Sequence, residues 1–187
     1  MEDPMPDSKI TQAIPANSNL IIKFYDINKM RQKLESFKWW EEMKETKIIY
    51  ENLTILNQLN ERYQLNEIFN NQLIYLSSVL GGGDKPNFLF ITSISDIQVK
   101  TNKLMRTVFS SDNNPRLYEG VTINNIKINT PEKPDVNIFF SVYNEVFLLS
   151  FSEIIIQESI RQLKSGDDLF KLNPIKKLDQ NLPKYSD

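Results

Sequence analysis

Apolar residues recur along the chain at two spacings, and the spacing separates predicted strands from predicted helices. Alternation or short apolar runs predict strands at Leu20–Tyr25, Leu73–Leu80, Asn87–Ile94, Leu117–Ile128, Val136–Tyr143 and Val146–Phe151. Apolar residues at every third or fourth position predict helices over 27–43, 48–59, 65–70, 97–109 and 153–164. Because these elements do not alternate as strict βαβ units, the order predicts an α+β fold: a largely antiparallel sheet with helices packed on one face.

Turn and cap residues fix several boundaries of these elements. The glycine-rich run Gly81–Pro86 would join two antiparallel strands, although Leu73–Leu80 also fits helical spacing and would then extend the preceding helix. Asn144-Glu145 reads as a two-residue turn. Asp26 is placed to cap the helix that follows it, and Gly166 stands where a helix C-cap belongs.

The most apolar positions of these elements predict one shared core. The side chains expected to be largely buried together are Ile22, Phe24, Leu34, Phe37, Trp40, Phe90 and Phe147. Trp39 is offset from the apolar stripe of its helix by about 100°. Burial against a neighbouring helix is favoured for both tryptophans, but an exposed Trp39 would make a good interface anchor, so Trp39 is the candidate interface residue.

A short internal similarity suggests the domain organisation. Lys9–Ser18 aligns without gaps on Lys177–Ser186, with Lys, Gln, Pro and Ser identical and Leu replacing Ile twice. Coincidence in a sequence of low diversity is the alternative to a tandem duplication. We therefore expect an extended leader over 1–13, a single α+β domain over 14–166, and a linker with the start of a truncated second repeat over 167–187.

Composition removes most catalytic chemistry. The chain of 187 residues has no His and no Cys, which excludes imidazole bases, thiol nucleophiles, disulfides and ordinary zinc sites. The net charge of −2 and dispersed basic residues give no basis for binding nucleic acid. No apolar run reaches the length of about 20 residues that a membrane helix needs. An enzyme would have to use carboxylates, Lys or Tyr, and no cofactor is expected.

Two loops contain residues typical of ligand-binding loops but lack the spacing that such loops need. Gly81–Lys85 is glycine-rich, yet a strand rather than a helix N-terminus follows it, so a hairpin loop is favoured over a phosphate cradle. Asp112–Asn114 offers oxygen ligands for calcium. It lacks the alternating spacing and distal Glu of a calcium loop, and a helix-ending turn is favoured.

The remaining polar candidates also have simpler interpretations. Candidate pairs of catalytic carboxylates are Glu41-Glu42, Glu61 with Glu67, and Asp167-Asp168. Glycosidic chemistry requires two acids about 5–10 Å apart across a cleft, and adjacent acids on a helix point in different directions. Asn52-Leu53-Thr54 matches an N-glycosylation acceptor, but its helical context argues against use.

Several segments together resemble a family. The chain resembles the N-terminal module of a large family of bacterial cell-envelope proteins. The segments that carry the resemblance are Leu20–Tyr25 after Ile14-Pro15, the Trp39-Trp40 helix, Leu73–Ile94, Tyr118–Ile123, and Val146–Ser152 followed by Ile156–Arg161. That family is described only as a domain of unknown function. The resemblance implies an extracytoplasmic location, an anchor or signal upstream and a longer C-terminal part. It implies no catalytic or binding residues.

The sequence thus favours a non-catalytic, extracytoplasmic interaction or scaffold module of a larger envelope protein. Its partner would be another protein, its own downstream repeat or a surface polymer, with no nucleic acid and with membrane contact only through an anchor. A hydrolase that uses carboxylates and a small-ligand or lipid-binding domain are the alternatives. A deep pocket with convergent carboxylates would favour the hydrolase, and a wide apolar cavity would favour the ligand carrier.

Overall fold

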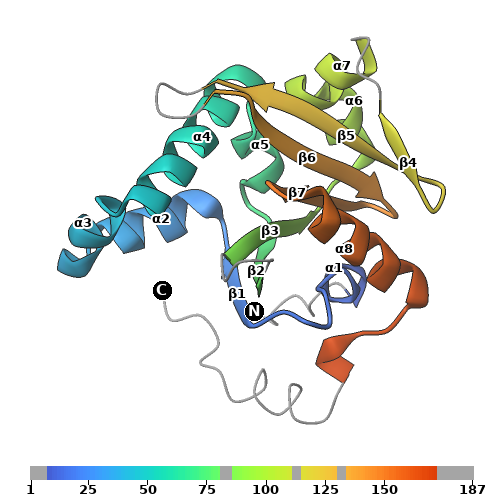
Figure 1. Cartoon of the computed structure of the whole chain (residues 1–187), viewed down its shortest axis with the longest axis horizontal. Helices are drawn as coiled ribbons and strands as arrows, with labels where there is room; N and C mark the ends of the chain where they lie inside the picture. The colour runs from blue at the N-terminus through green and yellow to red at the C-terminus, as the bar shows by residue number, and fades with distance from the viewer. Residues whose placement is uncertain (1–7, 81–85, 111–114, 130–133, 172–187) are drawn as a thin grey trace.

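A computed structural model describes residues 8–80, 86–110, 115–129 and 134–171 of the chain (Figure 1). The strands are β1 (Leu20–Tyr25), β2 (Leu73–Leu80), β3 (Pro86–Ser93), β4 (Arg116–Tyr118), β5 (Val121–Ile128), β6 (Val136–Tyr143) and β7 (Val146–Ser150). The helices are α1 (Ser8–Gln12), α2 (Ile27–Glu35), α3 (Lys38–Lys44), α4 (Lys47–Tyr63), α5 (Asn66–Phe69), α6 (Asp96–Thr101), α7 (Lys103–Ser110), α8 (Glu153–Ser165) and the short 3-10 helix η1 (Leu169–Lys171).

All strands join one seven-stranded sheet in the order β1-β2-β3-β7-β6-β5-β4, and every neighbouring pair is antiparallel. The predicted α+β fold with an antiparallel sheet is therefore confirmed. The predicted hairpin is also confirmed, because β2 pairs with β3 from Ile74 opposite Thr92 to Leu80 opposite Pro86. The glycine loop that joins them, Gly81–Lys85, lies outside the described residues.

Helices cover both faces of the sheet, not one as predicted. Side chains alternate along each strand, so Phe90 and Phe147 face a core shared with α4, α5 and α7. Ile91 and Leu148 face the opposite core, which α1 and α8 close. The sheet is thus the middle of three layers. Periodicity marks an apolar stripe on each helix but does not say which sheet face that stripe covers.

The long N-terminal helix predicted over 27–43 is two helices. Phe37 adopts an extended backbone (φ −91°, ψ 128°) between α2 and α3. The hydroxyl of Ser36 donates to the carbonyl of Lys33 at 2.7 Å, which completes the end of α2. As predicted, Asp26 caps α2, and its carboxylate accepts from the backbone N–H groups of Asn28 and Lys29 at 2.8 and 3.3 Å.

Two other predicted elements are also divided by capping or turn residues. Asn102 separates α6 from α7, because its side chain accepts from the N–H of Leu104 at 2.9 Å and its backbone is extended. Glu119 and Gly120, both at positive φ, turn the chain between β4 and β5 where one strand was predicted. The sequence Glu-Gly is a weaker turn signal than Asn-Gly, which is why alternation alone suggested continuity.

The predicted core is only partly correct. Phe24, Phe90 and Phe147 are buried, whereas Leu34 and Trp40 are half-buried. Ile22 and Phe37 are 42% and 40% exposed, so their predicted burial is wrong. Ile22 lies on the edge strand and Phe37 in the break between α2 and α3, where no further layer of the described chain covers them.

The ends of the described body also differ from the prediction. Residues 8–12 form α1 rather than an extended leader, and Ile10 and Ile14 are buried in the second core. The hydroxyl of Ser159 on α8 donates to the carbonyl of Ala13 at 2.6 Å, which fixes this segment. Gly166 ends α8 at φ 73°, as the C-cap prediction required. Beyond it, Phe170 packs edge-on against Tyr75 with ring centroids 5.6 Å apart.

Candidate interaction surface

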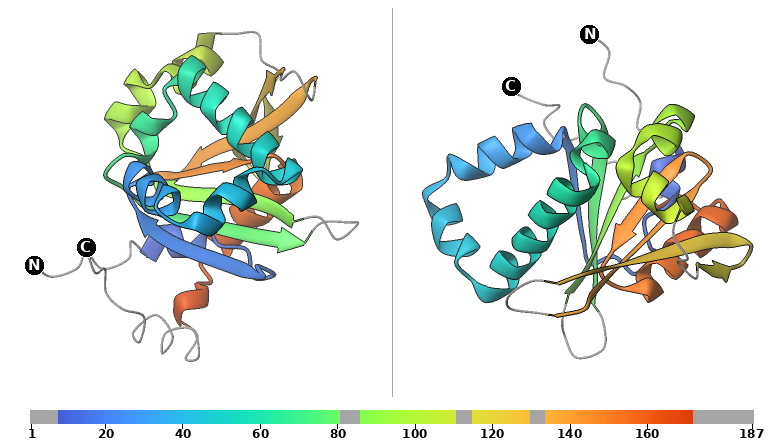
Figure 2. Two further views of the ribbon diagram at one scale, coloured as in Figure 1. Left: turned by 90° about the vertical axis from the view of Figure 1, so that its left-hand side faces the viewer. Right: turned by 90° about the horizontal axis from the view of Figure 1, so that it is seen from above.

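Helices α2, α3 and α4 form an arm that projects from the sheet (Figure 2). The chain leaves the sheet at Asp26, runs outward along α2, turns through α3 and returns along α4. Neither α2 nor α3 contains a buried residue, while Ile55 and Leu59 in the second half of α4 are buried in the core. The arm is therefore rooted in the core through α4, and its far end lies in solvent.

The end of the arm carries a cluster of large apolar side chains, which we call the aromatic tip and which consists of Phe37, Trp39, Trp40 and Met43. Phe37, Trp39 and Met43 are 40%, 47% and 40% exposed. The rings of Phe37 and Trp39 stack with centroids 5.5 Å apart, and Trp40 stands edge-on to Trp39 at 6.1 Å. The stacking orders the rings before any partner arrives, which lowers the entropy cost of binding.

The charges around the aromatic tip balance one another. Arg31 pairs with Glu35 at 2.9 Å, and Lys44 pairs with Glu41 at 2.6 Å, both within one helix. Such exposed pairs contribute little to stability, but they leave no net positive field. The described surface next to the exposed rings thus carries paired charges of both signs.

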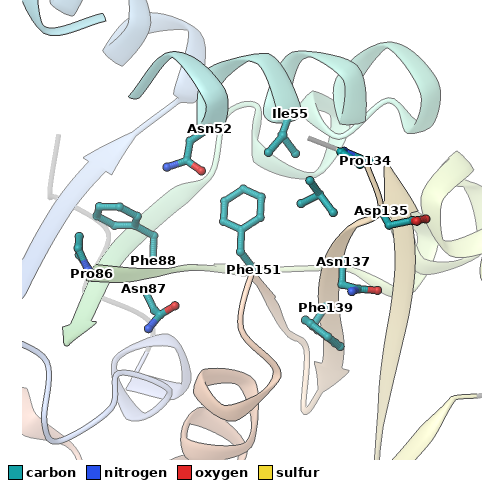
Figure 3. Close-up of a pocket in the computed structure, with 11 residues that line it drawn as sticks. Asn52, Ile55, Pro86, Asn87, Phe88, Pro134, Asp135, Asn137, Phe139 and Phe151 are labelled. Carbon is teal, nitrogen blue, oxygen red and sulfur yellow. The ribbon is translucent and has the colours of Figure 1, made fainter. Parts of the chain in front are cut away.

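A concave feature, which we call the notch, lies at the end of the sheet under α4 (Figure 3). It is a pocket of about 360 Å³. Its described walls come from α4, β3, β6 with the two residues before it, and the residue after β7, and they comprise Asn52, Ile55, Pro86, Asn87, Phe88, Pro134, Asp135, Val136, Asn137, Phe139 and Phe151. Only one of these residues is acidic and the lining mixes amides with rings, so the notch is neither a carboxylate-lined cleft nor a wide apolar cavity.

The carboxylates singled out in the sequence do not converge. Glu41, Glu42, Glu61 and Glu67 are exposed along the helices. Glu67 accepts from the side chain of Asn102 at 3.2 Å, which ties α5 to the α6–α7 junction. These contacts are structural, and nothing in them arranges two acids across a cleft.

Asp168, the half-buried member of the Asp167-Asp168 pair, has a structural role as well. Its carboxylate accepts from the hydroxyl of Thr11 at 3.0 Å and from the N–H of Phe170 at 2.9 Å. It therefore joins α1 to η1. Within the described residues, no three acidic side chains gather closely enough to hold a metal ion.

The other sequence candidates divide between the arm and the loops. Asp112–Asn114 lies outside the described residues, as Gly81–Lys85 does. Asn52 of the glycosylation triplet lines the notch from α4. Trp39, for which burial was the favoured interpretation, is in fact 47% exposed.

Sequence reasoning missed the partners of Trp39 and the notch itself. Phe37 was assigned to the core, yet it stacks on Trp39. The break at Ser36 is the signal that could have separated the two helices, because Ser readily ends a helix. The notch has no local signal, since it is built from strands far apart in the sequence.

Comparisons with protein-family models, curated proteins and solved structures give no match for this chain. None of the helices in the described part of the chain has the length and apolarity that a membrane-spanning helix requires.

Proposed function

We propose that this chain is a non-catalytic interaction module of a larger protein, and that the aromatic tip is the surface by which it holds a protein partner. The observation that carries the proposal is the stacked and exposed pair Phe37 and Trp39 at the end of the arm. Trp is enriched among the residues that dominate binding energy at interfaces, and preordered rings concentrate apolar area at one point. The charge balance around the tip leaves apolar complementarity as the main source of affinity.

The test is site-specific photo-crosslinking in cells that express the full-length protein. A photoreactive phenylalanine at position 39 is expected to give one adduct with a protein partner. The same probe at Ile97, which is 73% exposed on α6, is the matched control and is expected to give none. Phe37→Ala should weaken the adduct at position 39, because it removes the stacking partner. Equal labelling from positions 39 and 97, or adducts with lipid alone, would contradict the proposal.

The chain's own downstream repeat is one candidate for this partner. Its first segment, Lys177–Ser186, aligns on Lys9–Ser18, so the contacts of Lys9–Ser18 show whether Lys177–Ser186 fits the same place on this body. Thr11 donates its hydroxyl proton to Asp168, whereas the aligned Asp179 carries a carboxyl group in place of that hydroxyl. Ala13 is fully buried, and the aligned Asn181 is larger. Lys177–Ser186 would therefore not replace Lys9–Ser18 on this body, and a second repeat would need a body with its own complementary residues.

The proposal includes an extracytoplasmic location, which is supported only by the resemblance to the envelope family. Labelling of intact cells with a membrane-impermeant amine reagent tests it. The exposed lysines Lys29, Lys33 and Lys38 of the arm are expected to react without lysis. Reaction that requires lysis would place the protein inside the cell and would leave the role of the aromatic tip unchanged.

A further inference from the structure

Helix α3 lies at the far end of the arm (Figure 2) and presents two rows of side chains to solvent. Residues four apart on an α-helix lie one above the other, so Trp39 and Met43 form one row and Lys38 and Glu42 form the row beside it. Trp39 and Met43 are 47% and 40% exposed, and Lys38 and Glu42 are exposed as well. We call these four residues the α3 face. It sets an apolar row beside a charged row.

The two sides of α3 differ in how their charges are paired. On the side opposite the α3 face, Lys44 and Glu41 pair at 2.6 Å. On the α3 face, Lys38 and Glu42 are one turn apart, yet neither forms an ion pair within the described residues. Lys before Glu at this spacing is the weaker order for a pair within one helix. Both charges therefore remain available to a second molecule.

The α3 face is complementary to a copy of itself. In a twofold contact, if residue i meets residue j of the other copy, residue j also meets residue i. When two α3 helices lie antiparallel, Trp39 of each copy can meet Met43 of the other, and Lys38 of each can meet Glu42 of the other. The midpoints of the two rows are one residue apart, a rise of about 1.5 Å, so one twofold axis serves both rows. Apolar groups then meet apolar groups, and each charge meets its opposite.

The antiparallel order is the one that satisfies both rows. A twofold axis along the helices would instead set the apolar row of each copy against the charged row of the other. Helix α3 contains no buried residue, so a second copy can approach the face without displacing packed side chains. A standard interface buries about 800 Å² on each partner, and a face of four residues buries less, so we expect a weak dimer.

We propose that the partner held by the aromatic tip is a second copy of this chain, bound through antiparallel contact of the two α3 faces. The inference rests on the proposed function and names its partner. The apolar row supplies the affinity, and the charged row fixes the orientation and selects a copy over other apolar surfaces. The adduct from a photoreactive residue at position 39 should then contain two copies of this chain.

The first test is sedimentation equilibrium of the full chain from about 10 μM to about 1 mM, the range in which a weak dimer forms. A monomer–dimer equilibrium is expected. Trp39→Ala should weaken the dimer at least about tenfold, because it removes the largest apolar group of the face. Ile97→Ala, at a position 73% exposed on α6, is the control and should leave the dissociation constant unchanged. A monomer at every concentration, or a dimer that Trp39→Ala leaves intact, would overturn the inference.

A charge exchange tests the antiparallel order. Lys38→Glu sets two carboxylates against each other twice in the dimer, and Glu42→Lys does the same with two ammonium groups, so each should weaken the dimer about tenfold. The double variant Lys38→Glu with Glu42→Lys restores both pairs and should recover the dimer. A mixture of the two single variants should form a heterodimer that is tighter than either homodimer, because all four charges are then matched.

Lys44→Glu is the matched control on the opposite side of the same helix and should leave the dimer unchanged, and thermal melting checks that every variant folds. Failure of the double variant to recover the dimer, or an equal loss in Lys44→Glu, would refute the pairing of Lys38 with Glu42. A monomeric protein whose position 39 still captures a different protein would refute this inference and leave the proposed function standing. A monomer with no adduct at all would refute both.

Discussion

The sheet and the arm contain similar large apolar residues but place them in opposite environments. Phe140 and Phe147 on the central strands are completely buried between β6, β7 and the helices of the first core. Phe37 and Trp39 on the arm are 40% and 47% exposed. Both regions show regular apolar spacing, so spacing alone does not distinguish a face that is covered within the chain from one that is not.

The difference is explained by the number of neighbours that each region has. A central strand has a strand on both sides and a helical layer on each face, so every side chain meets another element. The far end of the arm has only its own helices. In the sheet, burial of the aromatic rings therefore stabilises the protein when it folds. In the arm, much of the aromatic surface stays exposed after folding, and its burial would instead stabilise a complex with a partner.

The largest expected effect is a contrast between two Phe→Ala substitutions. Phe147→Ala should destabilise the protein by about 3–5 kcal/mol, because it leaves a cavity in a closed core. Phe37→Ala should cost less, about 1 kcal/mol, because Phe37 is 40% exposed and lies outside the closed cores. Chemical denaturation of both variants measures the two values.

An equal loss in the two variants would contradict the comparison. A loss of several kcal/mol for Phe37→Ala would mean that the arm closes over its aromatic tip in solution. Crosslinking from position 39 would then also fail, so the two experiments check each other.

The fold was predictable from sequence where elements are bounded by strong local signals. β2, β6 and α8 begin at their predicted starts, and α8 ends within a residue of its predicted end, because the apolar spacing and the capping glycine Gly166 are local signals. Strand order was not predictable. The pairing of β3 with β7 joins residues about 60 positions apart, and no local pattern specifies it.

The candidate site was predictable only in part. Trp39 was singled out because it lies off the apolar stripe, but burial was the favoured interpretation, and its 47% exposure corrects that prediction. Its stacking on Phe37 depends on the break between α2 and α3, which a continuous helical pattern conceals. The notch depends on where β7 stops relative to β3 and β6, which is a tertiary property.

A smaller effect is expected at the joint between the sheet and the arm. Asp26 has a positive φ of 66° and caps α2. Asp26→Ala removes the cap and places Ala in a strained conformation, so it should cost about 1–2 kcal/mol. Asp26→Gly removes the same cap without the strain and should cost less. Hydrogen exchange should show the loss confined to α2, and a loss spread evenly over the sheet would mean that arm and sheet unfold as one unit.

The smallest expected effect tests whether the contribution of a contact to stability depends on the region in which it lies or on its burial. Lys9 and Glu145 pair at 2.6 Å against the sheet side of the molecule, but their side chains are 49% and 66% exposed. The hydrogen bond from Lys9 and its charge lower the pKa of Glu145 in the folded state. A lowered folded pKa stabilises the protein above the unfolded pKa of about 4.5, and this stabilisation is lost as the pH falls through the folded value. Glu145→Gln should therefore lower the melting temperature only slightly at pH 7, and the difference from wild type should disappear once the pH falls below the lowered pKa of Glu145 in the folded state. Melting curves of both proteins between these pH values measure it. A large difference at pH 7, or one that persists in acid, would mean that position in the rigid sheet region and not burial determines how much a contact contributes.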